Sequence, residues 1–114
     1  MPQPIQATVY WDTANSRGTV DTISVPAGNG ATVIQWSCDT KVISGFAITG
    51  LDPAVFNPAP PNPPAPPPPP SPNMVTNFTT TDSNNQAQSY TYNVFANHVT
   101  GLTSCHDPKI ENGG

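Results

Sequence analysis

The segment ATVIQWSC, residues 31–38, carries the clearest strand pattern in this chain of 114 residues. Its apolar side chains at Ile34, Trp36 and Cys38 recur at every second residue, which is the period of a strand with one buried face. The residues just before it, Pro26 to Gly30, are strand breakers. The segment therefore predicts a β-strand with Trp36 in the core.

Working outward, six further segments show strand periods bounded by turn residues. They are Ile5–Trp11, Thr19–Val25, Lys41–Leu51 with a predicted bulge at Gly45, Met74–Thr81, Gln88–Ala96 and a closing strand between His98 and Glu111. No segment has a convincing helical period. Seven short strands separated by turns predict an all-β fold, an antiparallel sandwich of two sheets.

The inward side chains of these strands define the predicted core. It comprises Val9, Trp11, Ile23, Ile34, Trp36, Phe46, Ile48, Phe78, Tyr92 and Val94.

A proline-rich segment interrupts the strands. Between Pro53 and Pro72 the chain carries twelve of its sixteen prolines, with an unbroken run from Pro66 to Pro70. Proline fixes φ and lacks an N–H donor, so the segment predicts polyproline II rather than helix or central strand. Neither flank has enough apolar surface to fold alone. We therefore predict one domain, residues 1–114, in which residues 53–73 connect two strands.

Two features resemble the immunoglobulin-like fold. Trp36 lies on the third predicted strand, where that fold buries a tryptophan between its sheets. Tyr92-Asn93-Val94 is similar to the tyrosine-corner pattern, with Val94 where antibody domains place a cysteine. The ending DPKIEN, residues 107–112, resembles that of small uncharacterised bacterial all-β proteins. These resemblances imply a fold and no activity.

Composition limits the partners and the location. Only 9% of residues are charged and the net charge is −4, with Arg17, Lys41 and Lys109 as the three cations. This is no basic patch, so we expect no nucleic-acid binding. No apolar stretch is long enough to span a membrane as a helix. The lack of a signal peptide favours the cytoplasm, whereas the Thr/Asn/Ser-rich, Lys-poor composition favours an extracellular or virion-surface protein.

The two cysteines, Cys38 and Cys105, allow two interpretations. A disulfide between them would close a long loop and contribute about 4 kcal/mol in an oxidising compartment. The alternative is two unpaired thiols, which the lack of a signal peptide favours slightly.

The chain also contains the residue types of a blue-copper site, namely His98, His106, Cys105 and Met74. Their order argues against such a site, because Cys105 and His106 are adjacent and Met74 lies upstream. Cys105-His106-Asp107 contains the residue types of a nucleophilic triad, but the three residues are consecutive in the sequence, whereas a triad brings separate residues together in space. We expect no catalytic residue, metal or cofactor.

The remaining carboxylates have a structural explanation. Aspartates at predicted turns usually accept hydrogen bonds from nearby backbone. Those in question are Asp12, Asp21, Asp39, Asp52 and Asp82.

The sequence therefore predicts a non-enzymatic structural or binding β-sandwich module, at a cell or virion surface, with a protein partner or self-association. The first alternative is a proline-rich ligand, because Pro66 to Pro70 (Pro66, Pro67, Pro68, Pro69, Pro70) is similar to the uncharged polyproline bound by profilin-type aromatic grooves. A spacer or a segment packed on its own domain is the simpler explanation of that run. The second alternative is a metal or redox protein on a cupredoxin-like sandwich.

Overall fold

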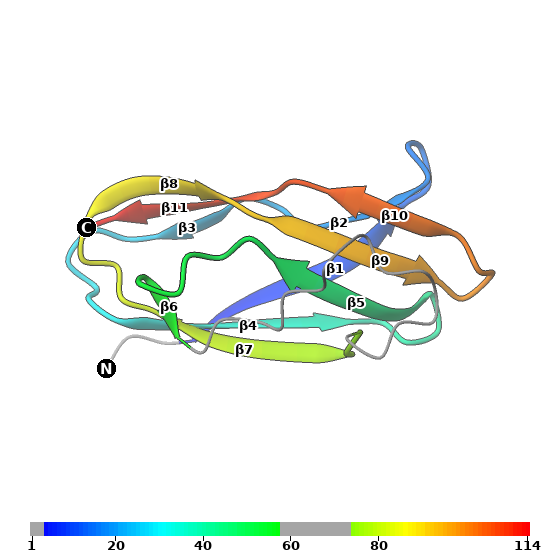
Figure 1. Ribbon diagram of the computed structural model, residues 1–114, viewed down its shortest axis with the longest axis horizontal. Coiled ribbons are helices and arrows are strands. Elements are labelled where there is room, and N and C mark those ends of the chain that lie inside the picture. The colour runs from blue at the N-terminus through cyan, green and yellow to red at the C-terminus, as the bar shows by residue number, and fades with distance from the viewer. Residues whose placement is uncertain (1–3, 58–73) are drawn as a thin grey trace.

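The computed structural model describes residues 4–57 and 74–114, which contain strands and no helix. The all-β prediction is therefore confirmed. The strands are β1 (Ile5–Asp12), β2 (Arg17–Thr19), β3 (Ile23–Val25), β4 (Thr32–Cys38), β5 (Ile43–Thr49), β6 (Phe56–Asn57), β7 (Asn77–Asp82), β8 (Ala87–Thr91), β9 (Asn93–His98), β10 (Thr103–His106) and β11 (Lys109–Gly113) (Figure 1).

The described strands form three sheets rather than the predicted two, because the strand breaks at Tyr92 and Pro108 separate β8 and β11 from β9 and β10. The largest has the order β2-β1-β4-β7-β6, and the two smaller ones have the orders β10-β9-β5 and β3-β11-β8. In Figure 1, β4 and β7 lie along one side of the molecule, and β8 with β11 lies along the other, continuing into β9 and β10. Strands from both sides of the proline-rich segment pair directly, since β4 pairs with β7 and β5 with β9.

The described residues contain eleven strands rather than about seven, because three predicted strands are each divided in two and the short strand β6 is added. The break between β8 and β9 falls at Tyr92, whose N–H donates to the Pro108 carbonyl at 3.1 Å. Pro108 lies at the facing break between β10 and β11, where its missing N–H cannot continue a ladder. The two-residue strand β6 was not predicted, although Phe56 is fully buried.

The expectation of purely antiparallel pairing is wrong. Six pairings are antiparallel, but β1 pairs with β4, and β3 with β11, in parallel. Parallel neighbours need a crossover connection between them. Residues 17–25 supply it for β1 and β4, because the chain leaves β1 through β2, joins β11 as β3 and then returns to the large sheet as β4.

The predicted core is largely confirmed. Eight of its ten residues are buried, whereas Trp11 and Phe78 are partly buried and pack against the core. At the centre, the Trp36 indole N–H donates to the Tyr92 hydroxyl at 3.2 Å, and Phe78 stacks on Trp36 at a centroid distance of 5.7 Å. This Tyr92 bond reaches a side chain on another sheet, whereas a tyrosine corner bonds to backbone upstream. The bulge predicted at Gly45 is present as a register shift between Ile43 and Gly45.

Candidate binding cleft

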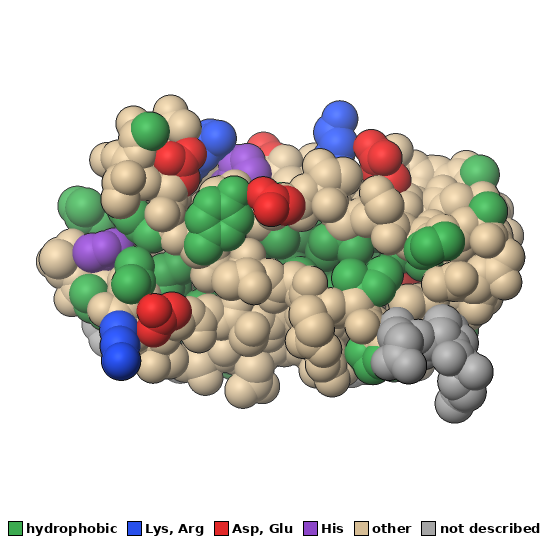
Figure 2. Space-filling model, turned by 180° about the vertical axis from the view of Figure 1, so that it is seen from behind, with side chains coloured by type: hydrophobic (Ala, Val, Ile, Leu, Met, Phe, Trp, Pro, Cys, Tyr) green, Lys and Arg blue, Asp and Glu red, His purple; other side chains and the backbone are tan. Residues whose placement is uncertain are grey.

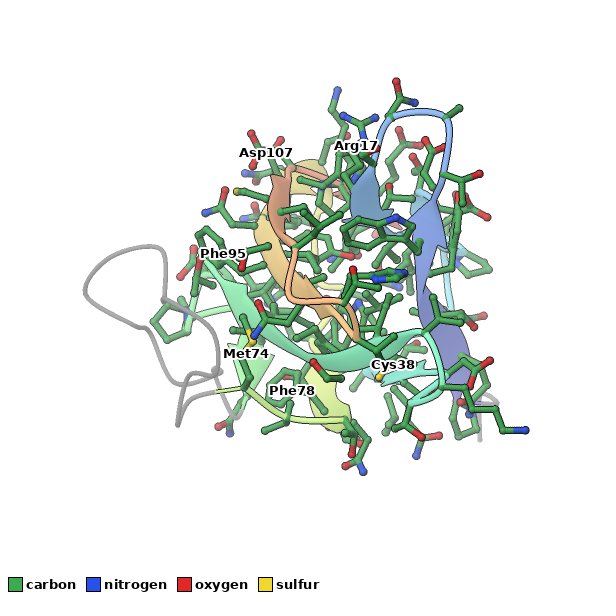
Figure 3. All side chains as sticks on the ribbon, turned by 90° about the vertical axis from the view of Figure 1, so that its right-hand side faces the viewer. Arg17, Cys38, Met74, Phe78, Phe95 and Asp107 are labelled. Carbon is green, nitrogen blue, oxygen red and sulfur yellow. The ribbon has the colours of Figure 1, made fainter. Side chains whose placement is uncertain are left out.

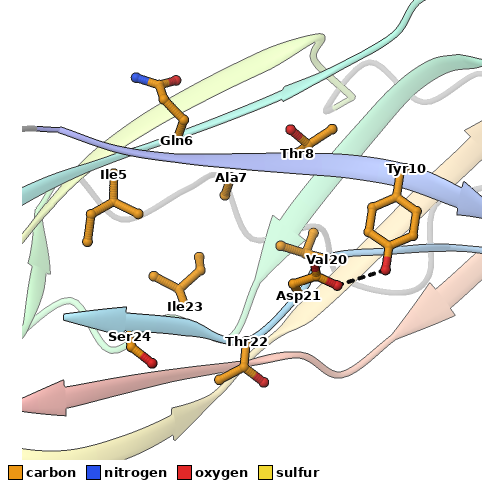
Figure 4. A pocket seen from close by; sticks show the side chains of 10 residues that line it. All are labelled: Ile5, Gln6, Ala7, Thr8, Tyr10, Val20, Asp21, Thr22, Ile23 and Ser24. Atoms are coloured by element: carbon orange, nitrogen blue, oxygen red, sulfur yellow. Dashed lines mark hydrogen bonds between the residues drawn. The ribbon is translucent and has the colours of Figure 1, made fainter.

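The strands β1 and β2 are paired over a short stretch and then separate. These strands pair only over Tyr10–Asp12 and Arg17–Thr19. Beyond Thr19 the chain bends away from the large sheet and continues as β3 beside β11. The strand predicted at Thr19–Val25 is therefore divided between two sheets, and β1 and β3 diverge on either side of a gap (Figure 4).

A cleft of about 260 Å³ occupies this gap. Its lining comes from two segments only, residues 5–10 of β1 and residues 20–24 of the bend and β3. Ile5 and Ala7 on one wall face Val20 and Ile23 on the other (Figure 4). In the space-filling view from behind, hydrophobic side chains reach the surface in a band along this seam between the two layers (Figure 2).

Each of the two strands that border the cleft has an open edge. On the side of β1 away from β4, β2 covers only Tyr10–Asp12, so Ile5–Val9 has no strand partner there among the described residues. Likewise β3 pairs with β11 on one side and with no described strand on the other. An open edge presents a row of backbone N–H and C=O groups that can accept another strand.

Asp21 is the charged side chain in the lining, and it differs from the other predicted turn aspartates. Asp12, Asp39, Asp52 and Asp82 each accept the backbone N–H two residues later, as predicted, at distances of 2.9–3.0 Å. Asp21 instead accepts the Tyr10 hydroxyl at 2.8 Å across the narrow end of the cleft (Figure 4). This bond to Asp21, together with burial, raises the pKa of Tyr10.

The seam beside β2 is closed, in contrast to the seam beside β3. The Gly18 N–H donates to the Ser104 hydroxyl at 2.8 Å, and Thr19 Oγ1 lies 2.7 Å from His106 Nδ1, so side chains join β2 to β10. A side chain at Gly18 would overlap Ala96 on β9. Close approach to β9 therefore depends on glycine at this position.

The two cysteines are free thiols. Cys38 on β4 is half-buried, with its Sγ 3.6 Å from the Ile43 carbonyl oxygen, and Cys105 on β10 is exposed. Burial, together with the Asp39 and Asp107 carboxylates respectively, raises the pKa of each thiol, which lowers its thiolate fraction and so its reactivity at neutral pH.

The two histidines considered as copper ligands have other partners in the described part of the chain. His106 contacts Thr19, and His98 bonds to Thr100 and lies against Trp11, with the two rings tilted at 56° and their centroids 4.7 Å apart. Cys38, Met74 and Asp107 lie well apart (Figure 3). Residues 4–57 and 74–114 contain no group of three or more His, Cys, Asp or Glu side chains that could hold a metal ion. Pro66–Pro70 lies outside the described residues.

Comparison with protein-family models and with curated proteins finds no match for this chain. In the described residues, no helix has the length and apolar character needed to cross a membrane.

Proposed function

We propose that this chain is a non-enzymatic binding module that receives an extended segment of a protein partner in the cleft between β1 and β3. The observation that carries the proposal is the pair of open strand edges, Ile5–Val9 and Ile23–Val25, on the two strands that border one cleft lined by both apolar and polar residues. The polar, Lys-poor composition supports the surface or virion location expected from the sequence.

The strand order supports an immunoglobulin-like sandwich as the scaffold. The order β1-β4-β7-β6 matches the A-B-E-D sheet of that fold, and β5-β9-β10 matches its C-F-G sheet. Two features depart from the pattern. β1 is parallel to β4, and Trp36 lies on β4, in the B place, whereas the family carries its tryptophan on strand C.

The geometry of the cleft favours strand addition. Because β3 continues the direction of β2, which is antiparallel to β1, an inserted strand would be parallel to one wall and antiparallel to the other. Its backbone would bond to the open edges, each bond contributing about 0.5–1.5 kcal/mol. Its alternate side chains would meet Ala7 and Ile23.

Charge narrows the class of partner. Asp21 supplies the charge of the lining, so an acidic residue at that end of the bound segment would be repelled. The partner segment is therefore extended, apolar at alternate positions, and neutral or basic beside Asp21.

The test is a titration with the neutral peptide acetyl-Thr-Val-Thr-Val-Thr-amide, followed by amide chemical shifts of the ¹⁵N-labelled protein. We expect saturable shifts confined to residues 5–9 and 20–25, at peptide concentrations of about 1 mM, where binding is worth about 4 kcal/mol. A peptide N-methylated at alternate residues lacks half the donors and should bind more weakly. Shifts elsewhere, or none, contradict the proposal, and dimerisation of the free protein would assign the cleft to a second copy of the chain.

Two matched variants test whether the peptide binds at the open edge of β3. Ser24 on β3 and Ser89 on β8 are both exposed, and both pair with Glu111 from opposite sides of β11. A lysine on an edge strand discourages strand addition. Ser24→Lys should therefore abolish the peptide shifts, whereas Ser89→Lys, next to the same glutamate but away from the cleft, should leave them unchanged.

The two alternative functions have distinct outcomes. If Pro66–Pro70 is the ligand, replacing residues 58–72 by a Gly/Ser loop removes partner binding while Ser24→Lys does not. If the chain is a metal or redox protein, elemental analysis after expression in metal-replete medium finds stoichiometric copper or zinc.

A further inference from the structure

A buried polar cluster joins β7 to β11 at the end of the molecule where the C-terminus lies (Figure 1). Its members, Asp82, Asn84 and Asn112, are only 0%, 1% and 6% exposed. Asp82 ends β7 in the large sheet, whereas Asn112 lies on β11 in a three-stranded sheet. The cluster therefore connects two sheets, and none of its members was predicted to be buried.

The hydrogen bonds of the cluster converge on one carboxylate oxygen. Asp82 Oδ1 accepts the Asn84 backbone N–H at 2.9 Å and the Asn112 side-chain amide at 2.8 Å. Asn84 has a φ of 47°, a conformation that asparagine tolerates better than most residues. Its side chain donates to the Pro26 carbonyl and accepts the Gly114 N–H, both at 3.1 Å.

Two oxygens of the bonded pair remain without a partner. Asp82 Oδ2 and Asn112 Oδ1 are both buried, and neither has a hydrogen-bond partner in the described residues. An ionised carboxylate and an amide oxygen can only accept, so these two atoms cannot satisfy one another. A proton on Oδ2 changes this, because a carboxylic acid has one donor.

We propose that Asp82 is protonated in the folded protein and forms a cyclic acid–amide pair with Asn112, in which Oδ2–H donates to Asn112 Oδ1 while Asn112 Nδ2 donates to Asp82 Oδ1. The pair, here called the Asp82–Asn112 clamp, has both of its hydrogen bonds between the two sheets only while that proton is present. The clamp is independent of peptide binding in the β1–β3 cleft.

Among the described residues, no cation contributes to the pKa shift of Asp82. Thr32 on β4 and Phe56 on β6 are its strand neighbours. Tyr90 on β8 is a titratable neighbour, and its pKa is raised by burial and then by the charges of Asp82 and Asp52. On β11 the charged residues Lys109 and Glu111 alternate onto the exposed face. Burial raises the pKa of Asp82, and its bonds from Asn112 and Asn84 oppose that shift only in part.

The direction of the pH effect follows from the raised pKa. An unfolded aspartate ionises near pH 3.9. Above that pH the folded clamp still holds its proton and the unfolded chain does not. The stability that the clamp contributes is therefore fully present below about pH 3.9 and is lost as pH rises toward the folded pKa. Over that range the folding equilibrium constant falls by up to about tenfold per pH unit.

The first test is the ¹³Cγ chemical shift of Asp82 as a function of pH. We expect its midpoint above that of Asp12, an exposed carboxylate whose pKa is lowered by a bond from the Asn15 side chain. A midpoint for Asp82 at or below about 3.9 would show that the folded protein holds the carboxylate ionised, and would overturn the proposal.

The second test compares two substitutions by urea unfolding between pH 4 and pH 8. Asp82→Asn places a permanent donor where the proton would be, so it should raise the folding constant at pH 8 and remove the pH dependence assigned to the clamp. Asp82→Ala deletes both partners of Asn112 and should lower the folding constant at every pH. An Asp82→Asn protein that is less stable than the wild type at pH 8, or unfolded, would mean that the cluster requires the charge.

Discussion

The strand predicted at Thr19–Val25 starts at the last residue of β2 and ends with β3, and these two observed strands have different surroundings. Arg17–Thr19 pairs with β1, and its backbone and side chains also bond to β10 through Ser104 and His106. Ile23–Val25 pairs with β11 and leaves its other edge on the cleft. The same stretch of chain therefore closes the seam between the layers at one end and opens it at the other.

The difference between the two seams arises from local chemistry. The closed seam has a glycine that lets β2 approach β9, and a hydroxyl that accepts the free N–H of that glycine. At the open seam, the Tyr10 hydroxyl donates to Asp21 across the narrow end, and β3 pairs only with β11 among the described strands. Strand edges close where such partners are present and remain open for binding where they are absent.

The largest effect is expected in the core beneath both seams. Trp36→Ala removes a fully buried ring that bonds to Tyr92 and stacks on Phe78, and should cost about 3–5 kcal/mol of unfolding free energy. Chemical denaturation measures the loss. A cost below about 1 kcal/mol would mean that Trp36 does not join the layers.

Gly18→Val tests the closed seam. The added side chain overlaps Ala96, so overpacking should cost about 1–3 kcal/mol. Ser24→Val is the matched change at the open seam, and because Ser24 is exposed it should cost less than about 0.5 kcal/mol. Equal costs in the denaturation curves would remove the distinction between the seams.

Ser104→Ala tests the hydrogen bond of the closed seam. It leaves the part-buried Gly18 N–H without its acceptor, and should cost about 1 kcal/mol. Thr22→Ala, in the exposed wall of the cleft, is the comparison and should be nearly neutral. A neutral Ser104→Ala would show that pairing with β1 alone holds β2 in place.

The smallest expected effect is the loss of stability at acid pH that arises from His106. Burial, followed by the charge of Arg17, lowers the pKa of His106, so protonation is less favourable in the folded state. The contribution of neutral His106 to the free energy of unfolding is present above the unfolded pKa of about 6.5 and is lost as pH falls below that value. The urea midpoint should fall slightly between pH 7 and pH 5, and His106→Gln should remove that part of the decline. An unchanged slope in the variant would assign the decline to other groups.

The period of two was sufficient to predict the strand segments and most of the core, because alternation reports which face is buried. It could not predict that the chain leaves β1 after Thr19 and continues as β3 beside β11. Val20 and Ile23 are both buried although they are three residues apart, an odd spacing that one straight strand cannot place on a single face. That spacing was the available signal for the bend, and with it for the cleft.

The buried cluster could not be predicted for a different reason. Asp82 and Asn84 have the composition of an exposed turn, and only the return of β11 beside β8 brings Asn112 to them. Pairings between residues so distant in sequence are set by the fold as a whole rather than by local pattern.

Amide hydrogen exchange of the free protein tests most directly whether the β1–β3 seam is open. Successive N–H groups of a strand point to opposite sides, so an edge strand protects only alternate amides. We expect slow and fast exchange to alternate along Ile5–Val9 and Ile23–Val25, and continuous protection along Ile34–Ser37 of β4, which is paired on both sides. Continuous protection along Ile5–Val9 would show that the edge is already covered, and would contradict the open cleft.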